Sequence, residues 1–485
     1  MNFNLGKDTF AHFLKYVAKP FGIQNADEVW PNSQHIIVKM KIIIAGAGNL
    51  GFHLAELLSY ENQDITLIDE NQEVLDYAST HLDLLTLRGD SSSINVLREA
   101  GIENAHLLLA VTTSETTNIV TASLAKKLGA RQTVARVHKS EYLKEVNREL
   151  VAAMGIDSIF SPVQLAAKEI LRLVKRCSFT DIFEFEEGKI SLFGITLDDF
   201  SPLVNVQLSN WKQLVANEAL RPIAILRGSQ TIIPNGEVVL KRNDHVYFIT
   251  KKDKVDEVER FVGAKKVKVK NVMILGGSPL AYETAKLMED DFNITLIEGS
   301  KDQCKILTEK LNNTLIINGK ADNVDLLQEE GLDRMDAFIA LTPNSETNII
   351  ASLTAKNHGV YKTIAQVENK EYTFISQNIG VDTLINQKLI AANNIFRFVR
   401  QGTVEAITGL HGVEAEVIEF VVTKNNLMTR KPIKDLHFPK AALIGGVIRG
   451  DESLIPDGNF QLQMDDKVIV FTMPEAVSKV ERMFR

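Results

Sequence analysis

An internal repeat constrains the fold of this chain more than any other feature of its sequence. When the sequence is shifted by 230 positions, Arg88–Tyr142 aligns without gaps to Asn318–Tyr372, and 17 of the 55 pairs are identical. Unrelated segments match at about 5–6% of positions, so roughly three identities were expected. A second register, of 222 positions, relates Ile233-Pro234-Asn235-Gly236 to Ile455-Pro456-Asp457-Gly458. The chain therefore consists of two tandem copies of a two-part unit.

Length and composition limit the class of protein. At 485 residues the chain predicts three or four domains, and its hydrophobic content of 45% is ordinary for a globular protein. Its net charge of −8 disfavours nucleic acid as a partner. The two cysteines, Cys177 and Cys304, exclude a disulfide framework and a CxxC metal site, which fits a reducing compartment. No apolar run approaches the roughly 20 residues that a membrane-spanning helix needs.

The first part of each copy alternates short apolar runs with amphipathic stretches. This alternation is typical of βαβ units around a parallel sheet, and nearly continuous apolar runs suit strands that helices cover on both faces. The sequence therefore predicts the α/β class, with two tandem Rossmann-type parallel-sheet domains, each followed by a small α+β lobe. The expected strands are Lys41–Ala45, Ile65–Ile68, Leu84–Leu87, Leu107–Val111 and Thr133–Val137 in copy one, and Val272–Leu275, Ile294–Ile297, Leu315–Ile317, Ala337–Leu341 and Thr363–Val367 in copy two.

The repeat also predicts where the domains begin and end. Ser161-Pro162 is a good N-cap and first helical residue for a connector helix that runs through Val174. Residues 1–39 have no counterpart in copy two; they contain a short amphipathic pattern, for which we weigh docking to a membrane or partner against a loosely held arm or an upstream start. The expected divisions are an extension (1–39), a Rossmann domain (40–158), a helical connector (159–176) and a small lobe (177–260), then a second Rossmann domain (270–386), connector (387–402) and lobe (403–485).

A glycine-rich turn after the first strand predicts a dinucleotide site. Within such a turn the first glycine permits the tight bend, the second lets the backbone approach a pyrophosphate, and the third lets the helix pack on the sheet. Asp69, which ends the second strand, would bond the ribose hydroxyls, and with Glu70 beside it would repel a 2′-phosphate, so NAD(H) is favoured over NADP(H). The turn reads Gly46-Ala47-Gly48-Asn49-Leu50-Gly51.

Other polar residues stand at strand ends, where ligands of open α/β sheets bind. Asp90 follows the third strand and is a candidate for the adenine side. Thr112 and Thr113 follow the fourth and offer hydroxyls near the pyrophosphate or the second ribose. Arg136, on the fifth strand, is a candidate phosphate partner. For Asp90 and Arg136 an ordinary turn residue or surface ion pair is an equal alternative.

Copy two repeats the scaffold with a looser site. Ser278 replaces the glycine of closest phosphate approach, and Pro279 removes a backbone donor. An acid remains as Glu298, whereas Gln366 stands in the arginine position. The hypothesis is that copy one binds NAD(H) tightly, whereas copy two binds a nucleotide weakly, binds a different one, or binds none.

Together these motifs resemble a known family. Met40–Arg485 is similar to the peripheral nucleotide-binding subunit of bacterial Trk potassium-uptake systems, which carries two regulator-of-potassium-conductance (RCK) units. The resemblance rests on the glycine turn, on Asp69, on Arg88-Gly89-Asp90, on the segment from Thr112 to Asn118, and on the two Ile-Pro-Asn/Asp-Gly turns with Asp244 and Asp466.

The resemblance implies a regulator that gates potassium uptake. It implies binding of NAD(H), with ATP or ADP as further candidate ligands, and a homo-oligomeric ring built through the Rossmann lobes, most simply a homotetramer. It also implies docking onto a potassium-translocating membrane subunit at the cytoplasmic face of the inner membrane. Gating would be a population shift, because a ligand that binds two ring states differently changes their balance.

Two other functions remain open at this point. An NAD-dependent oxidoreductase needs an acid or base near the nicotinamide, but none of the ten histidines recurs in its repeat register. A redox-sensing transcription factor needs a basic helix-turn-helix, which the sequence does not show. We therefore expect no catalytic residues, no metal site and no enzymatic activity.

Overall fold

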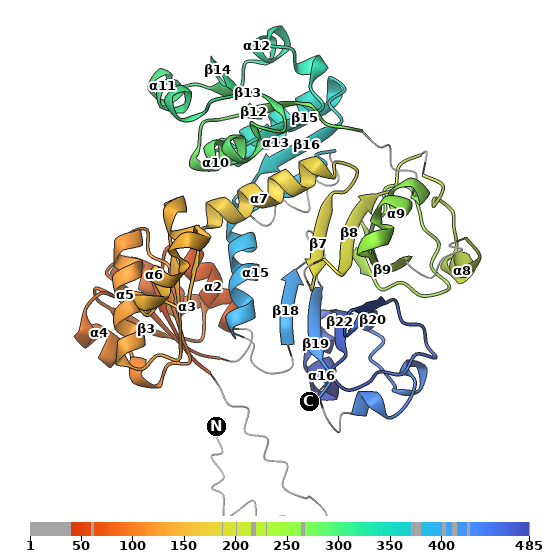
Figure 1. Cartoon of the computed structure of the whole chain (residues 1–485), viewed down its shortest axis with the longest axis horizontal. Helices are drawn as coiled ribbons and strands as arrows, with labels where there is room; N and C mark the ends of the chain where they lie inside the picture. The colour runs from red at the N-terminus through yellow and green to blue at the C-terminus, as the bar shows by residue number, and fades with distance from the viewer. Residues whose placement is uncertain are drawn as a thin grey trace, which may run out of the picture.

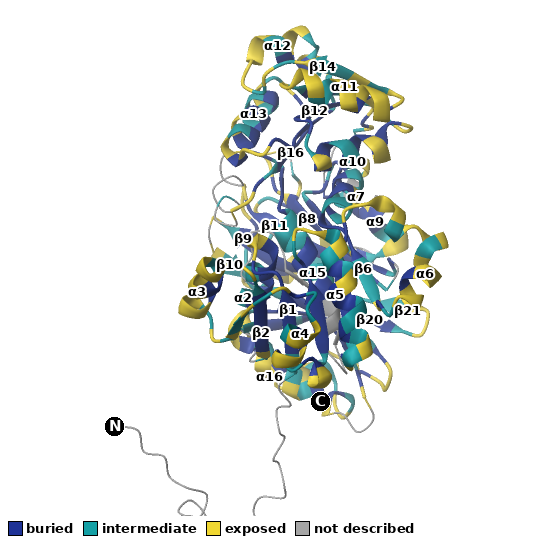
Figure 2. Cartoon of the chain, turned by 90° about the vertical axis from the view of Figure 1, so that its left-hand side faces the viewer, coloured by how far each residue is buried: buried dark blue, intermediate teal, exposed yellow. Residues whose placement is uncertain are grey.

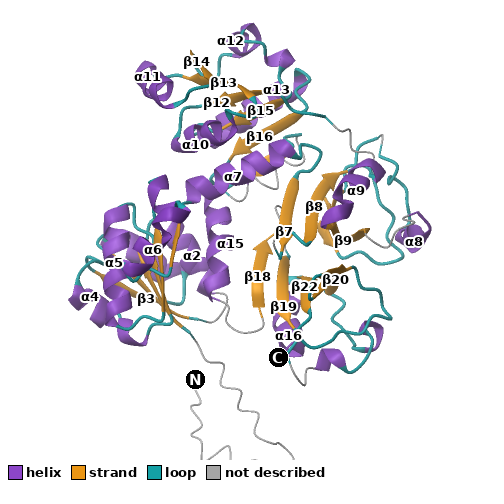
Figure 3. Cartoon of the chain, viewed as in Figure 1, coloured by secondary structure: helices purple, strands orange, loops and turns teal. Residues whose placement is uncertain are grey.

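The computed structural model describes residues 40–484, apart from 60–62, 187, 200, 215–219, 229, 263–266, 370–371, 373–379, 400–403, 410–414 and 424–426. The segment predicted as an extension, 1–39, lies outside the described residues. The described chain forms two parallel and two antiparallel sheets, which alternate along the sequence (Figures 1 and 3). The predicted fold class is confirmed.

The first Rossmann lobe is a six-stranded parallel sheet in the order β3-β2-β1-β4-β5-β6. Helices α2 and α3 pack on one face, and α4 and α5 cover the other. The strands are β1 (Lys41–Ala45), β2 (Asp64–Asp69), β3 (Leu85–Arg88), β4 (Leu107–Ala110), β5 (Gln132–Arg136) and β6 (Ser158–Phe160), and the helices are α2 (Asn49–Ser59), α3 (Gln72–His81), α4 (Ile94–Glu99), α5 (Glu115–Leu128) and α6 (Arg148–Ala153).

The second Rossmann lobe has the same topology, in the order β14-β13-β12-β15-β16-β17. In both lobes the helix after the fourth strand begins at a side-chain cap, Ser114 on the amide of Thr117 and Asn344 on the amide of Thr347. The elements are β12 (Asn271–Leu275), α10 (Pro279–Met288), β13 (Asn293–Glu298), α11 (Lys301–Lys310), β14 (Thr314–Asn318), α12 (Val324–Glu329), β15 (Ala337–Ala340), α13 (Ser345–Asn357), β16 (Lys362–Gln366) and β17 (Thr383–Ile385).

The sixth strand of each sheet was missed in the sequence. It is only three residues long, too short to show a pattern, and it pairs in parallel with the fifth strand. The expected boundary at residue 158 falls inside β6, so the first lobe extends to Phe160.

Each small C-terminal lobe is a five-stranded antiparallel sheet with helices against one face. A buried aspartate in each lobe accepts two hydrogen bonds from an arginine one strand away, Asp244 from Arg227 and Asp466 from Arg449. These two pairs explain why both residue types recur in the repeat. The elements are β7 (Asp181–Phe185), β8 (Ile190–Thr196), α8 (Trp211–Leu214), β9 (Leu220–Arg227), β10 (Gln230–Ile232), β11 (His245–Lys251) and α9 (Val255–Phe261), then β18 (Val404–Gly409), β19 (Glu416–Val421), β20 (Ala442–Arg449), β21 (Glu452–Leu454), β22 (Lys467–Thr472) and α16 (Pro474–Phe484).

The two connector helices are exchanged between the copies. Helix α7 (Pro162–Lys175) begins at the predicted Ser161 cap, and its apolar face, which includes Ile170, joins the core of the second Rossmann lobe. Helix α15 (Gln387–Val399) contributes Ala391, Ala392 and Ile395 to the core of the first. Figure 1 shows α7 beneath α10 and α15 beside α2. Each Rossmann lobe is therefore completed by the other copy.

The two C-terminal lobes also pack on each other. Leu192, Tyr247 and Ile249 of the first form one buried cluster with Val417 and Phe471 of the second. Figure 2 shows the buried strands inside and the exposed outer helices of the Rossmann lobes. No helix among the described residues is both long and apolar enough to cross a membrane.

Candidate functional site

The glycine turn between β1 and α2 has the shape that its sequence predicts. Gly46 has a φ of +107°, in the region that favours glycine, and a Cβ there would lie 2.8 Å from the backbone nitrogen of Thr112. A Cβ on Gly51 would lie 1.8 Å from the carbonyl oxygen of Gly46, so the helix packs closely on the turn. A Cβ on Gly48 would meet nothing within 4 Å. Gly48 is thus open to a ligand, and it carries no side chain that could cap α2.

The acid at the end of β2 is held against this turn. The Asp69 carboxylate accepts hydrogen bonds from the amides of Ala47, at 2.7 Å, and of Asn71, at 2.9 Å. Each bond uses a different carboxylate oxygen, and each oxygen keeps a further lone pair. The side chain is therefore fixed in direction while it retains acceptor sites for ribose hydroxyls.

The turn opens onto a cavity of about 630 Å³. This size lies within the range of small-molecule sites, roughly 300–1,000 Å³. Of the predicted site residues, nine line the cavity: Gly46, Gly48, Asn49, Leu50, Asp69, Asp90, Thr112, Thr113 and Arg136. Ala47, Gly51 and Glu298 do not line it. Ala47 and Gly51 belong to the turn itself, whereas Glu298 lies at the matching position of the second lobe.

Sequence reasoning missed one wall of this cavity. The second Rossmann lobe contributes the end of β16 and the start of α15, because the exchange of connectors brings both against the first lobe. Asn386 caps α15 by accepting from the amides of Lys388 and Leu389. The lining residues from this side are Gln366, Val367, Glu368, Asn386, Gln387 and Lys388, and Pro162 at the start of α7 joins them.

Sequence reasoning therefore also missed that Gln366 belongs to the site of copy one. The sequence placed it only in the site of copy two, as the counterpart of Arg136. In the structure both residues line the same cavity, one from each lobe. The repeat register contained the signal, since it pairs the two positions, but only the packing of the lobes brings them together.

Two buried atoms in this cavity have no hydrogen-bond partner among the described residues, Nε of Arg136 and Oε1 of Gln366. Burial lowers the pKa of the Arg136 guanidinium, although arginine stays charged in proteins. Leaving such groups unpaired is costly. Both residues line the cavity, and the charge of the Arg136 guanidinium suits an anionic ligand. The residues present therefore fit a phosphate-bearing nucleotide.

The hydroxyl and amide of Thr112 are already hydrogen-bonded within the protein and are therefore less available to a ligand than the sequence position suggests. Its hydroxyl donates to Oδ1 of Asn118, at 2.7 Å, and its amide donates to the same atom, at 2.8 Å. Thr342 and Asn348 repeat this arrangement in the second lobe. The shared bonds tie the end of the fourth strand to the next helix, so these recurring residues are explained by the fold.

Asp90 and Thr113 lie at the rim of the cavity. The Asp90 carboxylate accepts from the amide and hydroxyl of Ser92, which is the turn role we considered as the alternative. Thr113 is exposed. Both residues line the cavity, and their predicted contacts with a ligand stay predictions.

The matching turn of the second lobe is closed by its own side chain. Ser278 caps α10, its hydroxyl accepting from the amide of Ala281 at 3.2 Å, and Pro279 is the first helical residue. Both carboxylate oxygens of Glu298 accept from backbone amides, those of Gly277 and Ser300. The hydroxyl of Ser278 therefore already bonds an amide at the start of this helix, and weaker nucleotide binding in copy two stays a prediction.

Comparisons with known proteins agree with this geometry. Family models for the TrkA-N domain match residues 42–162 and 272–387, and models for the TrkA-C domain match 192–263 and 417–485. The chain is 31% identical over 455 residues to a "Trk system potassium uptake protein TrkA homolog 1" of Methanosarcina mazei, covering 92% of this chain and 100% of the relative. It is equally 31% identical over 451 residues to a "Trk system potassium uptake protein TrkA" of Halomonas elongata, covering 92% of this chain and 99% of the relative.

Solved structures share the fold at low identity. The "GsuK RCK domain" superposes with a TM-score of 0.57 at 15% identity, covering 93% of this chain and 96% of the other. The "GsuK channel bound to NAD" superposes with a TM-score of 0.57 at 16% identity, covering 99% and 85%. With two TrkA-N and two TrkA-C matches in alternation, and with relatives matched over almost their whole length, the chain belongs to the TrkA family of Trk-system potassium uptake proteins.

Proposed function

We propose that this chain is a regulatory subunit of a Trk-type potassium-uptake channel and that it responds to NAD(H). One observation carries the proposal: the uncapped start of α2 faces a cavity that both Rossmann lobes line. The relatives are named for potassium uptake, and a structural neighbour at low identity is described as a channel bound to NAD. ATP and ADP are further candidate ligands, since they share the adenosine phosphate portion.

The chain's own residues supply both halves of the binding site. The turn at Gly46–Gly51 and Asp69 would hold a phosphate and a ribose from the first lobe. Gln366 and the first turn of α15 would contact the same ligand from the second lobe. A ligand that touches both lobes binds their closed arrangement more tightly than an open one, and that difference in affinity shifts the population.

The connector helices would convert this population shift into movement of the C-terminal lobes. Pro162 of α7 and Gln387 of α15 line the cavity, and each helix is packed into the opposite Rossmann lobe. A change in the angle between the lobes would move both helices and the C-terminal lobes that follow them. In the assembled complex, such movement would act on the channel.

We propose that the chain acts as a homo-oligomeric ring, most simply a tetramer, at the cytoplasmic face of the membrane through its channel partner. Support comes from apolar side chains that are exposed at matched positions of both Rossmann lobes: Leu85 and Leu315, Ile94 and Val324, and Val120 and Ile350. An apolar position exposed in both copies is suited to contact with another copy of the chain. We propose no enzymatic activity and no nucleic-acid partner.

Co-purification with a potassium-translocating Trk subunit, with and without NADH, tests the function. We expect a stable complex and an NADH-dependent change in potassium flux through that subunit in reconstituted vesicles. An Asp69→Asn variant, which keeps the side-chain size but loses the charge, should retain the complex and lose much of the NADH response. Failure of the wild-type chain to bind any Trk membrane subunit, or turnover of a substrate with NADH, would contradict the proposal.

A further inference from the structure

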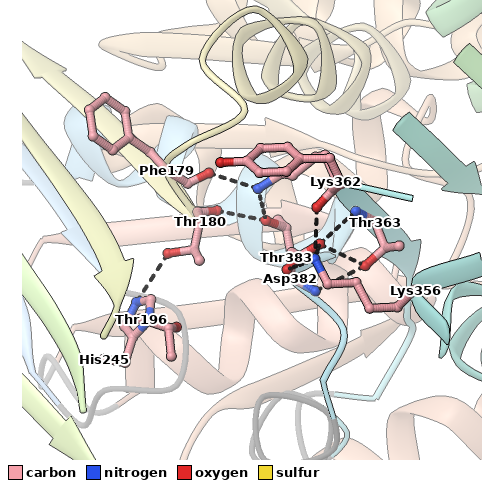
Figure 4. A network of polar contacts seen from close by, with 10 residues as sticks. Phe179, Thr180, Thr196, His245, Lys356, Lys362, Thr363, Asp382 and Thr383 are labelled. Carbon is pink, nitrogen blue, oxygen red and sulfur yellow. Dashed lines mark hydrogen bonds and ion pairs between the residues drawn. The ribbon is translucent and has the colours of Figure 1, made fainter. Parts of the chain in front are cut away.

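Strand β16 joins the nucleotide cavity to a buried lysine. Gln366 at the end of the strand lines the cavity, and Lys362 at its beginning is 1% exposed. The two residues are four positions apart, or roughly 13 Å along a strand. The Lys362 ammonium donates to the carbonyl oxygen of Phe179, at 2.7 Å, and to Oγ1 of Thr383, at 2.8 Å (Figure 4). Phe179 belongs to the segment that leads from α7 into the first C-terminal lobe.

The neighbouring strand makes a second bond to the same segment. Thr383, at the start of β17, donates its hydroxyl to the carbonyl oxygen of Thr180, at 2.9 Å. Side chains on two adjacent strands of the second Rossmann lobe thereby donate hydrogen bonds to the consecutive carbonyl groups of Phe179 and Thr180 in the first copy. Figure 4 shows both bonds converging on this segment. Movement of β16 would be passed directly to the start of β7.

From Thr180 the polar contacts continue into the C-terminal lobe. Its hydroxyl lies 3.2 Å from Oδ2 of Asp181 and 3.3 Å from Nε2 of His245. Tyr247 donates its hydroxyl to the same Asp181 oxygen, at 3.0 Å, and its ring belongs to the cluster between the two C-terminal lobes. Polar contacts thus connect Thr180 to Tyr247, which lies at the interface between the two C-terminal lobes.

The first Rossmann lobe forms the same type of sheet without a lysine at this position. Copy one has Gln132 at the matching position, on β5, the equivalent strand of the first Rossmann sheet. The neighbouring network that does support the fold is present in both copies, as Lys356 with Asp382 and as Lys126 with Asp157. Burial lowers the pKa of the Lys362 ammonium, with Asp382 and Asp181 opposing that shift, which reflects the cost of desolvating a charge. Because an apolar side chain would avoid this cost, the lysine calls for another explanation.

We propose that Lys362 is a positioning residue that couples nucleotide binding in the inter-lobe cavity to the first C-terminal lobe. The inference rests on the proposed function, since it concerns regulation by the same ligand. Lys362 does not touch the cavity itself. It acts through β16 at one end and through the carbonyl groups of Phe179 and Thr180 at the other.

Hydrogen exchange of the full chain, with and without saturating NADH, tests the coupling. In the wild type, NADH should slow exchange at least threefold both in the glycine turn and in β7 (Asp181–Phe185). In Lys362→Met, which has similar length and no charge, the turn should keep its protection while β7 loses it. The NADH dissociation constant should stay within about threefold of wild type, since the lysine is outside the cavity. Lys362→Gln, which restores one donor, should recover part of the β7 response.

Two further variants guard against a merely structural effect. Gln132→Met makes the matched change in copy one and should leave the β7 response intact. Thr383→Val removes the second bond and should weaken the response even if Lys362→Met fails to fold. Unchanged β7 protection in both Lys362→Met and Thr383→Val would overturn the coupling, as would a wild type in which NADH protects the turn alone. Absence of protection at the turn in the wild type would instead show that the proposed function fails, and the coupling with it.

Discussion

Within the glycine turn, the residues differ in what surrounds them. Gly46 needs its positive φ, Gly51 lies against a carbonyl oxygen, and only Gly48 faces open space. The fold therefore requires glycine at positions 46 and 51, whereas at position 48 only a bound ligand would require it. This difference allows mutations to separate loss of stability from loss of binding.

Replacing Gly48 with alanine should weaken NADH binding by at least about tenfold, which corresponds to about 1.4 kcal/mol. The added methyl group would clash with nothing in the protein but would occupy the space of a phosphate. Thermal unfolding should change little, within the effect of an ordinary surface substitution, about 0.5 kcal/mol. Titration calorimetry measures the affinity, and Gly236→Ala in a C-terminal lobe is the control. Unchanged affinity in Gly48→Ala would mean that phosphate does not approach the turn.

Replacing Gly51 with alanine should instead destabilise the first lobe, by about 1–3 kcal/mol as for other overpacked sites. The reason is the 1.8 Å approach of the new Cβ to the carbonyl oxygen of Gly46. Ala281 stands at the matching position in copy two, where it is buried. Denaturant unfolding of the wild type and the variant gives the free-energy difference. A variant as stable as wild type would show that the turn can relax.

Local spacing was sufficient to predict the turn and Asp69, because strand, turn and helix are contiguous in the sequence. It was not sufficient for the second wall of the cavity. Gln366 and Lys388 approach Gly48 only because the lobes pack against each other, and no short-range pattern encodes that packing. The hydroxyl of Thr112 was credited to a ligand because its Asn118 partner, six residues away, could not be recognised without the structure.

At the scale of elements, the alternation of strands and helices predicted both parallel sheets. It could not predict the exchange of α7 and α15, since an amphipathic helix shows that one face is buried but not which surface covers it. Strands β6 and β17 were missed for another reason, because three residues are too few to establish a period. The sequence thus yields the class and most elements, whereas partners between elements come from tertiary packing.

The exchange makes a specific stability prediction. Ile170→Ala in α7 should cost about 2–5 kcal/mol, the usual range for a buried isoleucine. The loss should appear in the second Rossmann lobe, because Ile170 belongs to the same buried cluster as Val272, Ile274 and Leu280. Hydrogen exchange should therefore increase in β12 more than in β1. The exposed neighbour Lys168→Ala is the control, and faster exchange confined to the first lobe would contradict the exchanged arrangement.

At the scale of the whole molecule, the matched apolar side chains predict how copies associate. Val120 on α5 and Ile350 on α13 are 40% and 64% exposed. The double variant Val120→Glu with Ile350→Glu should lower the oligomeric state measured by light scattering, since burying two carboxylates opposes association. Both side chains point to solvent within one chain, so its fold and melting temperature should be preserved. Tyr77→Glu, at an exposed position on α3, serves as the control, and an unchanged oligomer would rule out this surface.

The stoichiometry of NADH binding tests the central claim most directly. Titration calorimetry of the wild-type chain should give one high-affinity site per chain, because the start of α2 is open and the start of α10 is capped by Ser278. Gly48→Ala should weaken that site, whereas Ser278→Ala should leave it unchanged. Two equal high-affinity sites per chain, or no binding of NADH, NAD⁺, ATP or ADP to the folded protein, would contradict the account.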